Sequence, residues 1–460
     1  MNTRIALVTL LALGGSRSPM FGASPNQNWP QWRGPTATGL APKADPPTSW
    51  SEESNVKWKL KLPGYGTSTP IIWENQIFIQ TAIAASKPEP KPQASVAASA
   101  EPGERPRRGG PGGIRSDKPM EPYQFTLLAI DRGAGKIAWQ KLLRQEVPHE
   151  GHHPDHGFAS ASPITDGEHV ISYFGSRGLY CLDLNGNVIW QKELGKMQTR
   201  NSFGEGSSPA LFGHVLVVNW DHEGSDFVVA FDKTNGKELW RQPRNEPTGW
   251  STPLVVKHNN RLQVVISAPG KVRSYELATG KPIWECAGMT ENSIPTPVAG
   301  HDMLFATSGF RGAALLAIKL GRTGDLTGTD AIAWSHNKST PYVPSPLLYD
   351  DSIYFFSRND ATLSCFDAKT GKPHYEAERL EGVVGMYASP VGAAGRVYIL
   401  GRDGGAVVIK KSDKLEVLAT NKLADKFDAS PAAVGRELYL RGHENLYCIA
   451  EPTKTAAITK

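Results

Sequence analysis

The sequence predicts an all-β fold, an eight-bladed β-propeller of four-stranded antiparallel blades that is closed by the N-terminal strand. Three observations support this prediction. A Ser/Thr-Pro pair recurs eight times, and an acidic strand end followed by a glycine turn and an aromatic residue recurs between the pairs. The last repeat lacks one strand, and a matching strand stands before the first repeat.

The Ser/Thr-Pro pairs mark where each repeat begins. Their prolines are Pro70, Pro163, Pro209, Pro253, Pro297, Pro346, Pro390 and Pro431, at spacings of 93, 46, 44, 44, 49, 44 and 41 residues. Most of these spacings match the length of a four-stranded blade. Proline is tolerated as the first residue of a strand, where its missing N–H breaks no ladder bond. The first spacing is long because residues 84–121, rich in Pro, Ala, Gly, Lys and Arg, form an insertion that we expect to be a disordered loop in blade 1.

The second half of each repeat carries a turn and an aromatic residue. Strands end in an acid, as in Ala230-Phe-Asp232, and the following turn contains a glycine that supplies a positive φ. The aromatic residues that follow are Trp139, Trp190, Trp240, Trp284, Trp334 and Tyr375. We expect each of them to pack between neighbouring blades. Two repeats depart from the pattern: the fifth has an enlarged turn at 321–329, and the seventh has Val417 or Leu418 in place of the ring.

The ring is expected to close through its two ends. The repeat at Pro431 stops after Leu446-Tyr-Cys-Ile449, and the missing outer strand is Asn55–Leu60, with Trp58 at the aromatic position. Closure of this kind removes exposed sheet edges. The predicted organisation is a signal peptide (1–23), an N-terminal extension (24–53), one propeller domain (54–451) and a C-terminal tail (452–460).

Composition narrows the class of protein. The chain has 460 residues with 50 basic and 45 acidic side chains, a small excess that argues against a nucleic-acid partner. Four cysteines exclude a disulfide scaffold. The apolar run Ile5–Leu13 after Arg4 is typical of a signal peptide and too short to span a bilayer. We therefore expect a periplasmic or secreted monomer with no membrane span.

The repeats resemble the pyrroloquinoline-quinone-like (PQQ-like) β-propeller repeat family. Residues 230–240, Ala-Phe-Asp-Lys-Thr-Asn-Gly-Lys-Glu-Leu-Trp, nearly complete its A-x-D-x-x-T-G-K-x-x-W pattern. The motif Asn28-Trp-Pro-Gln-Trp-Arg-Gly-Pro35 is similar to the N-terminal motif of a secreted bacterial branch of that family. The resemblance implies a propeller and two kinds of function, quinone-dependent alcohol or sugar dehydrogenase and assembly scaffold for outer-membrane β-barrels. The adjacent Cys-Cys pair of the dehydrogenases and the lipid-anchor cysteine of the scaffold are both missing from this sequence.

Ligands of propellers usually bind where the inner strands begin, so we expect the candidate site in the loops at that face. The candidate ligand-binding residues from these loops are Arg177, Glu205, Asp221, His222, Trp250, Arg311, Tyr342, Arg358, Tyr387, Arg402, Asp428 and Arg441. Two interpretations fit this set. The arginines bind a carboxylate or phosphate while the aromatic faces hold a sugar or quinone ring, or the arginines pair with Glu205, Asp221, Asp360, Asp403 and Asp428 as struts between blades.

A histidine-rich loop joins the first two blades. It contains His149-Glu-Gly-His152-His153-Pro-Asp155-His156, in which His152, His153 and His156 are candidate ligands of zinc or another divalent metal. Polar packing within the loop is the alternative.

These observations favour a non-catalytic scaffold that binds an unknown protein partner, an anionic small molecule or a saccharide at the arginine-rich face. The alternative is a quinone- or metal-dependent oxidoreductase acting on an alcohol or sugar, for which PQQ or a divalent metal is the possible cofactor. The missing Cys-Cys pair and the lack of a recognisable acid/base set favour the scaffold.

Overall fold

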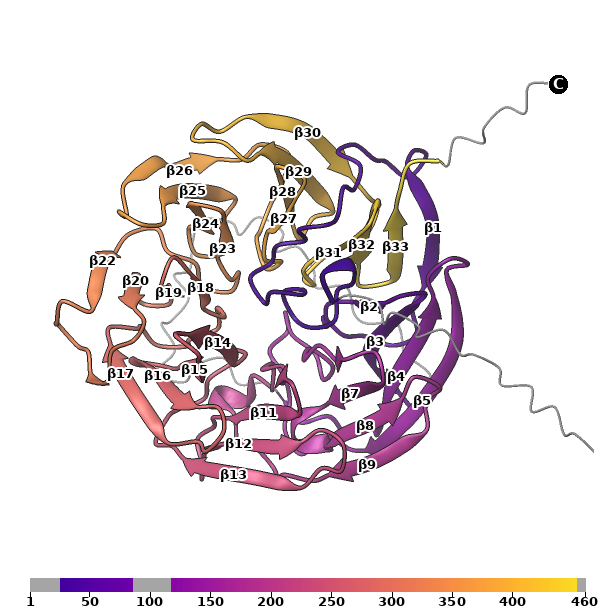
Figure 1. Ribbon diagram of the computed structural model, residues 1–460. Coiled ribbons are helices and arrows are strands. Elements are labelled where there is room, and N and C mark those ends of the chain that lie inside the picture. Colours follow the sequence, from indigo (N-terminus) through magenta and orange to yellow (C-terminus); the bar gives the residue numbers. More distant parts are fainter. Residues whose placement is uncertain (1–24, 86–116, 453–460) are drawn as a thin grey trace, which may run out of the picture.

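A ring of sheets forms the protein. The computed structural model describes residues 25–85 and 117–452. Within these residues the strands form eight sheets arranged in a ring (Figure 1), which confirms the predicted eight-bladed propeller. The expected signal peptide, most of the insertion and the tail beyond Pro452 lie outside the described residues.

Each blade is an antiparallel meander that runs from the channel outward. Blades 1–4 contain β2 (Ile71–Trp73), β3 (Gln76–Ala84), β4 (Tyr123–Asp131), β5 (Lys136–Glu146); β6 (Ile164–Thr165), β7 (His169–Tyr173), β8 (Leu179–Asp183), β9 (Val188–Lys192); β10 (Ala210–Phe212), β11 (Val215–Trp220), β12 (Phe227–Asp232), β13 (Glu238–Pro243); and β14 (Leu254–His258), β15 (Arg261–Ser267), β16 (Lys271–Glu276), β17 (Pro282–Ala287). Blades 5–8 contain β18 (Val298–Gly300), β19 (Met303–Ser308), β20 (Ala314–Lys319), β22 (Ile332–His336); β23 (Leu347–Tyr349), β24 (Ser352–Phe356), β25 (Thr362–Asp367), β26 (Pro373–Arg379); β27 (Val391–Ala393), β28 (Arg396–Leu400), β29 (Gly405–Lys410), β30 (Val417–Lys422); and β31 (Ala432–Val434), β32 (Glu437–Arg441), β33 (Asn445–Ile449), β1 (Val56–Lys61).

The described helices are short. They are the 3₁₀ turns η1 (Pro25–Gln27), η2 (Gly175–Arg177) and η3 (Arg200–Ser202). A search of the described residues finds no helix with the length and apolar character needed to cross a bilayer.

The two ends of the propeller domain meet in blade 8, as the sequence predicted. Strand β1 pairs antiparallel with β33, placing Trp58 opposite Cys448 and Lys59 opposite Tyr447. Leu438, Tyr439 and Leu446 in this blade are fully or almost fully buried. The last blade is therefore completed by residues from the other end of the domain.

The outer wall is held by contacts between a tryptophan and a glycine turn of the next blade. Trp240 on β13 donates its indole N–H to the carbonyl of Leu277 (2.8 Å), and its ring lies so close to Gly280 that an added Cβ would lie 2.5 Å from it. Gly280 also has φ = +72°, so the turn needs glycine for two reasons. An added Cβ would also lie 2.4–3.1 Å from the tryptophan ring in four further pairs, Trp58–Gly135, Trp139–Gly186, Trp190–Gly236 and Trp334–Gly371.

The two irregular repeats are explained by the same contact. Blade 5 has its enlarged turn where the glycine turn would stand, so Trp284 of blade 4 is buried and donates instead to Gln263 Oε1 (2.9 Å). The enlarged turn forms β21 (Gly324–Asp325), which pairs parallel with β17 and adds a fifth strand to a blade expected to have four. Blade 8 has no glycine turn after Ile449, and blade 7, which precedes it, carries exposed Val417 and Leu418 instead of a ring.

The inner strands are joined by a belt of hydroxyl groups. In seven of the eight Ser/Thr-Pro pairs the backbone N–H of the Ser or Thr donates to the side-chain hydroxyl of the corresponding residue in the next blade. Seven such bonds of 2.8–3.3 Å run through Thr69, Ser162, Ser208, Thr252, Thr296, Ser345, Ser389 and Ser430. The Thr69 hydroxyl donates back to the Ser430 carbonyl at 3.4 Å and closes the belt. The pairs therefore satisfy buried amides as well as opening strands.

The N-terminal extension is the indigo segment near β27, β31 and β2 (Figure 1), and it contacts the turns between first and second strands of blades 1, 7 and 8. These turns lie on the face opposite the loops that lead into the inner strands, which we call the lead-in loops. Arg33 is 1% exposed and donates to the carbonyls of Pro346 and Pro390, each at 2.7 Å. Burial lowers the pKa of Arg33 to about 9. Next to it, Trp32 reaches the belt and donates to Thr296 Oγ1 (3.1 Å). The extension thus forms a floor under the channel.

Candidate functional site

A cavity of about 530 Å³ lies at the end of the ring where the inner strands begin. Residues of the hydroxyl belt and Trp32 line its inner part. Five aromatic rings from loops of different blades line it further out: Phe203, Trp250, Phe310, Tyr342 and Tyr387. The volume lies within the range of small-molecule sites, roughly 300–1,000 Å³. We call this space the mouth cavity.

The aromatic rings of the mouth cavity are held by specific contacts. Phe310 and Tyr342 stack with centroids 5.0 Å apart at 28°. The Trp250 indole N–H donates to the Gly204 carbonyl (2.8 Å), and the Tyr387 hydroxyl donates to Asp155 Oδ2 (3.0 Å). Burial raises the pKa values of Tyr342 and Tyr387, so both stay protonated at neutral pH. The walls therefore offer flat surfaces of fixed orientation.

One side of the mouth cavity carries surplus positive charge. Arg200 Nη2 lies 3.2 Å from Glu291 Oε2, and Arg311 Nη1 lies 3.6 Å from the same oxygen. Arg200 also contacts the Asn292 amide oxygen at 3.3 Å. Two guanidinium groups share one carboxylate, and the Arg311 side chain is 69% exposed. This positive side suits an anionic group of a ligand.

The other side carries surplus negative charge. Arg402 pairs with Asp428 (Nε–Oδ1 2.6 Å) and with Asp155 (Nη2–Oδ1 2.9 Å). His443 Nε2 lies 2.8 Å from Asp428 Oδ2. Two carboxylates share one guanidinium, and both line the cavity. This side offers acceptors for ligand hydroxyl groups.

Two loops between blades extend over the mouth cavity. The histidine-rich loop, 147–158, joins blades 1 and 2 yet reaches blade 7 through Asp155, Tyr387 and Arg402. The loop between blades 2 and 3, 193–209, reaches the lead-in of blade 5 through Arg200. The two loops also bind each other, since His153 N–H donates to the Phe203 carbonyl (3.0 Å). Apart from Ser208-Pro209, neither loop matches the repeat pattern.

The structure brings seven of the predicted site residues to the mouth cavity. They are His153, His156, Trp250, Arg311, Tyr342, Tyr387 and Asp428. Arg402 adjoins them, because its guanidinium lies 3.9 Å from the centroid of the Tyr387 ring.

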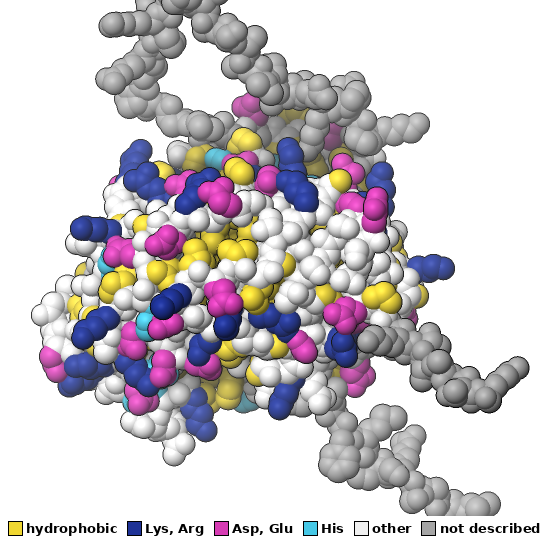
Figure 2. Space-filling model, turned by 90° about the horizontal axis from the view of Figure 1, so that it is seen from above, with side chains coloured by type: hydrophobic (Ala, Val, Ile, Leu, Met, Phe, Trp, Pro, Cys, Tyr) yellow, Lys and Arg dark blue, Asp and Glu magenta, His cyan; other side chains and the backbone are white. Residues whose placement is uncertain are grey.

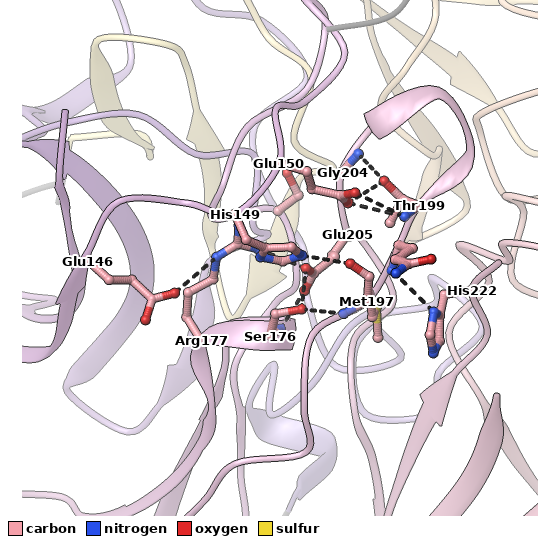
Figure 3. Close-up of polar contacts among 12 residues, drawn as sticks. Glu146, His149, Glu150, Ser176, Arg177, Met197, Thr199, Gly204, Glu205 and His222 are labelled. Atoms are coloured by element: carbon pink, nitrogen blue, oxygen red, sulfur yellow. Dashed lines mark hydrogen bonds and ion pairs between the residues drawn. The ribbon is translucent and has the colours of Figure 1, made fainter. Parts of the chain in front are cut away.

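Other predicted residues lie in ion pairs or away from the cavity. Arg177 and Arg402 pair with Glu205 and Asp428, two of the acids named as possible partners of the arginines. Arg177 is 3% exposed and donates to Glu205 Oε1 (2.8 Å) from the neighbouring blade (Figure 3). Asp221 pairs with Arg244 at 2.6 Å, with both side chains fully buried.

The remaining predicted residues make other contacts. The His222 Nδ1 accepts from the backbone N–H groups of Gln198 and Gly224. Arg441 is buried against Ser68, to whose carbonyl it donates at 3.0 Å, and burial lowers its pKa to about 9. Arg358 is exposed and does not line the cavity.

The three histidines proposed as metal ligands make separate contacts. His156 bonds the Glu205 carbonyl (3.1 Å) and the Ser160 hydroxyl (2.9 Å), so both ring nitrogens are used. Burial, and then the neighbouring His152, lowers the pKa of His156 to about 4. His152 Nδ1 bonds the His153 carbonyl, and His153 Nδ1 accepts from the Asp155 amide.

Two other groups of residues converge instead. Within the described residues, ligand atoms lie within 4.8 Å of one another in His149, Glu150 and Glu205 and in Asp166, Glu168 and His169. Lys233 already pairs with Asp166 in the second group.

Sequence reasoning missed several residues of the mouth cavity. Arg200 and Phe203 were not singled out, because the loop that carries them differs from its counterparts in other blades, and Phe310 was passed over beside Arg311 in a loop that does recur. Trp32 was part of a quoted motif, but nothing in the spacing shows that the extension runs under the ring.

The ring of blades and the mouth cavity define a propeller with a ligand-sized central site. A match to the family described as outer membrane protein assembly factor BamB covers residues 48–220 and 224–455. The chain therefore belongs to this family of PQQ-like β-propellers.

Similarity to individual proteins is more distant. Over 177 residues the chain is 30% identical to tetrathionate hydrolase of Acidithiobacillus ferrooxidans, a match covering 33% of this chain and 34% of that protein. The match thus spans about a third of the curated relative. A europium-containing methanol dehydrogenase has a TM-score of 0.58 at 10% identity, covering 91% of this chain and 90% of the other. Quinohemoprotein alcohol dehydrogenase from Comamonas testosteroni has the same TM-score and identity, covering 94% and 82%. The two solved structures share the fold.

The residues present do not reproduce the quinone-dehydrogenase pattern. All four cysteines, Cys181, Cys286, Cys365 and Cys448, are buried in four different blades. Two acids, Asp155 and Asp428, also line the mouth cavity.

Proposed function

We propose that the protein is a non-catalytic binding propeller that holds a small anionic organic molecule, of the class of acidic saccharides, in the mouth cavity. The observation that carries this proposal is the combination of stacked aromatic rings with opposite charges on the two sides of one cavity. A sugar ring stacks on Tyr342 or Trp250, a carboxylate meets Arg311 and Arg200, and hydroxyl groups donate to Asp155 and Asp428. Action in the periplasm or outside the cell is part of the proposal and rests on residues 1–13 alone.

The test is isothermal titration calorimetry of the protein with galacturonate oligosaccharides and, as a neutral comparison, maltose oligosaccharides. We expect binding of the acidic series and an affinity loss of about tenfold or more in Arg311→Gln, because a charge-assisted bond is worth about 1.5–3 kcal/mol. Arg358→Gln is the matched control, since Arg358 is an arginine of a corresponding loop that lies outside the cavity. Equal affinity in both variants, or no binding, would reject the proposal.

Two further ligands test the alternatives. Tetrathionate is included because the chain resembles part of a tetrathionate hydrolase, and binding that depends on Arg311 would change the ligand class to an inorganic dianion. PQQ with calcium tests the oxidoreductase alternative. Stoichiometric binding with reduction of a dye in the presence of an alcohol or sugar would contradict a non-catalytic role.

Trp32 provides an independent check of where the ligand lies. Because its side chain lies at the inner end of the mouth cavity, Trp32→Ala deepens the cavity, and we expect longer oligosaccharides to gain affinity relative to shorter ones. An unchanged length preference would place the ligand elsewhere.

A further inference from the structure

His149, Glu150 and Glu205 form a group in which three electron-pair donors face one another. Their ligand atoms lie within 4.8 Å of one another, and the three side chains come from the histidine-rich loop and the lead-in of blade 3 (Figure 3). Neither the repeat pattern nor the mouth cavity requires this arrangement.

The tautomer of His149 is fixed by its surroundings. Nε2 lies 2.6 Å from the Met197 carbonyl oxygen, which can only accept, so Nε2 carries a proton. Nδ1 is buried and has no hydrogen-bond partner among the described residues. In the neutral ring Nδ1 therefore carries an unshared lone pair, and the histidine lies beside two carboxylates.

The carboxylates are oriented by other donors. Glu205 accepts from Ser176 N (2.6 Å), Ser176 Oγ (2.7 Å) and Arg177 Nη1 (2.8 Å). Glu150 accepts from Thr199 N (3.1 Å) and Thr199 Oγ1 (2.5 Å). Among the described residues, Glu150 has no Lys or Arg partner. A cation is therefore missing from the charge balance of this group.

Small polar space adjoins the group. Glu205, Thr199 and Met197 line a cavity of about 20 Å³, which is enough for one water. Asn219 and Tyr173 also line it; they are 1% and 2% exposed, and their side-chain polar atoms have no partner within the described chain. A water bound there would donate to Asn219 Oδ1 and lie beside Glu205.

We propose that His149 (through Nδ1), Glu150 and Glu205 bind one divalent transition-metal ion, zinc in the first instance. One imidazole, two carboxylates and a water make a typical four-coordinate zinc set. Zinc–ligand bonds of about 2.1 Å place ligand atoms about 3.4 Å from one another, so separations of up to 4.8 Å would have to shorten when the ion binds. The ion fastens the histidine-rich loop to blade 3. This proposal is independent of what the mouth cavity binds.

The test is zinc titration of the full-length protein without a polyhistidine tag after dialysis against a chelator, followed by calorimetry and elemental analysis. We expect one zinc per chain and a loss of affinity of about 100-fold or more in His149→Ala and Glu150→Gln, since even outer-shell changes cost about 10–100-fold. His153→Ala, in the same loop, and His169→Ala, in the other histidine–acid group, are matched controls and should keep wild-type affinity.

Three results would contradict the zinc proposal. No zinc uptake by the wild type, or undiminished affinity in Glu150→Gln, overturns the proposal, as does a preference for calcium over zinc. If circular dichroism shows that His149→Ala is misfolded, the near-isosteric Glu150→Gln decides alone. X-ray absorption of the loaded protein should show one imidazole among oxygen ligands.

Discussion

The outer wall and the mouth of this propeller are built in different ways. On the outer wall the same contact is repeated, a tryptophan lying against the glycine turn of the next blade, as Trp240 does on Gly280. At the mouth, contacts are single and reach across the ring, as Asp155 of the loop between blades 1 and 2 does to Arg402 of blade 7. Repeated contacts define the scaffold, and unrepeated loops define what it can bind.

The surface of the molecule shows the same contrast. Lys, Arg, Asp and Glu are interspersed over the side of the ring (Figure 2). In the mouth cavity, by contrast, the charged residues are separated into the Arg200 and Arg311 side and the Asp155 and Asp428 side. A mixed surface keeps a protein soluble, whereas separated charges orient a ligand.

The largest expected effect concerns the outer wall. In Gly280→Ala the new Cβ would lie 2.5 Å from the Trp240 ring at φ = +72°, so overpacking and backbone strain add, and we expect a loss of about 3 kcal/mol of unfolding free energy. Gly213→Ala is the control, because Gly213 has φ = +60° with nothing within 4 Å of an added Cβ, and it should lose about 1 kcal/mol. Urea denaturation measures both. Equal losses would mean that the tryptophan contact does not hold the blades.

The contrast also explains how far sequence alone could go. The blades, their order, the closure by Trp58 and the outer-wall rings follow from the repeat, because each residue type recurs for the same local reason. The hydroxyl belt was not foreseen, since a serine before a proline has a sufficient local role in opening a strand. The exceptions at Trp284 and Val417 arise because the next blade lacks the glycine turn, and a single repeat does not show which turn the next blade has.

For the candidate site, several residues predicted from the sequence line the mouth cavity, but the ion pairs that involve the others did not follow from the sequence. Loop position placed Tyr342, Tyr387 and Asp428 at the mouth cavity. It could not separate Arg311, which is largely exposed there, from Arg177, which is buried in an ion pair. Whether such an arginine is exposed or buried in an ion pair depends on partners from other blades, which come from segments far apart in the chain. The histidine-rich loop was likewise singled out, but the group that converges uses His149.

The next largest expected effect is on the pH dependence of the unfolding free energy, which we expect to differ between His156 at the mouth and Asp166 away from it. Burial and His152 lower the pKa of His156 from 6.5 to about 4, with His153 and Asp428 also facing it. The unfolded chain therefore binds more protons between pH 6.5 and 4, and His156 costs stability as the pH falls through this window, by about 1–2 kcal/mol at pH 5.

In the turn between β6 and β7, away from the mouth cavity, Asp166 also loses stability as the pH falls, but over a lower range of pH. Burial acts to raise the pKa of Asp166, but Lys233 and the amides of His169 and Glu168 outweigh it and lower the pKa to about 2. The stability that Asp166 contributes is lost only below about pH 4. Urea denaturation at pH 7 and 5 should show a smaller pH effect in His156→Gln than in wild type, and no change in Asp166→Asn. A reduced effect in Asp166→Asn would contradict the separation of the two regions.

The smallest expected effect tests whether the mouth is energetically separate from the outer wall. Asp155→Asn removes the charge that pairs with Arg402, while the amide oxygen can still accept from Tyr387. The two charged side chains are 38% and 28% exposed, so we expect a loss of less than about 1 kcal/mol in global stability. Hydrogen exchange should nevertheless accelerate in residues 149–157, because the loop loses its attachment to blade 7 and opens locally. Asp403→Asn, which removes the exposed pair with Lys422 on blade 7, serves as the control and should leave exchange in that loop unchanged. If Asp155→Asn instead lowers global stability by about 2 kcal/mol or more, the loop supports the ring itself, and the mouth cannot vary independently of the wall that carries it.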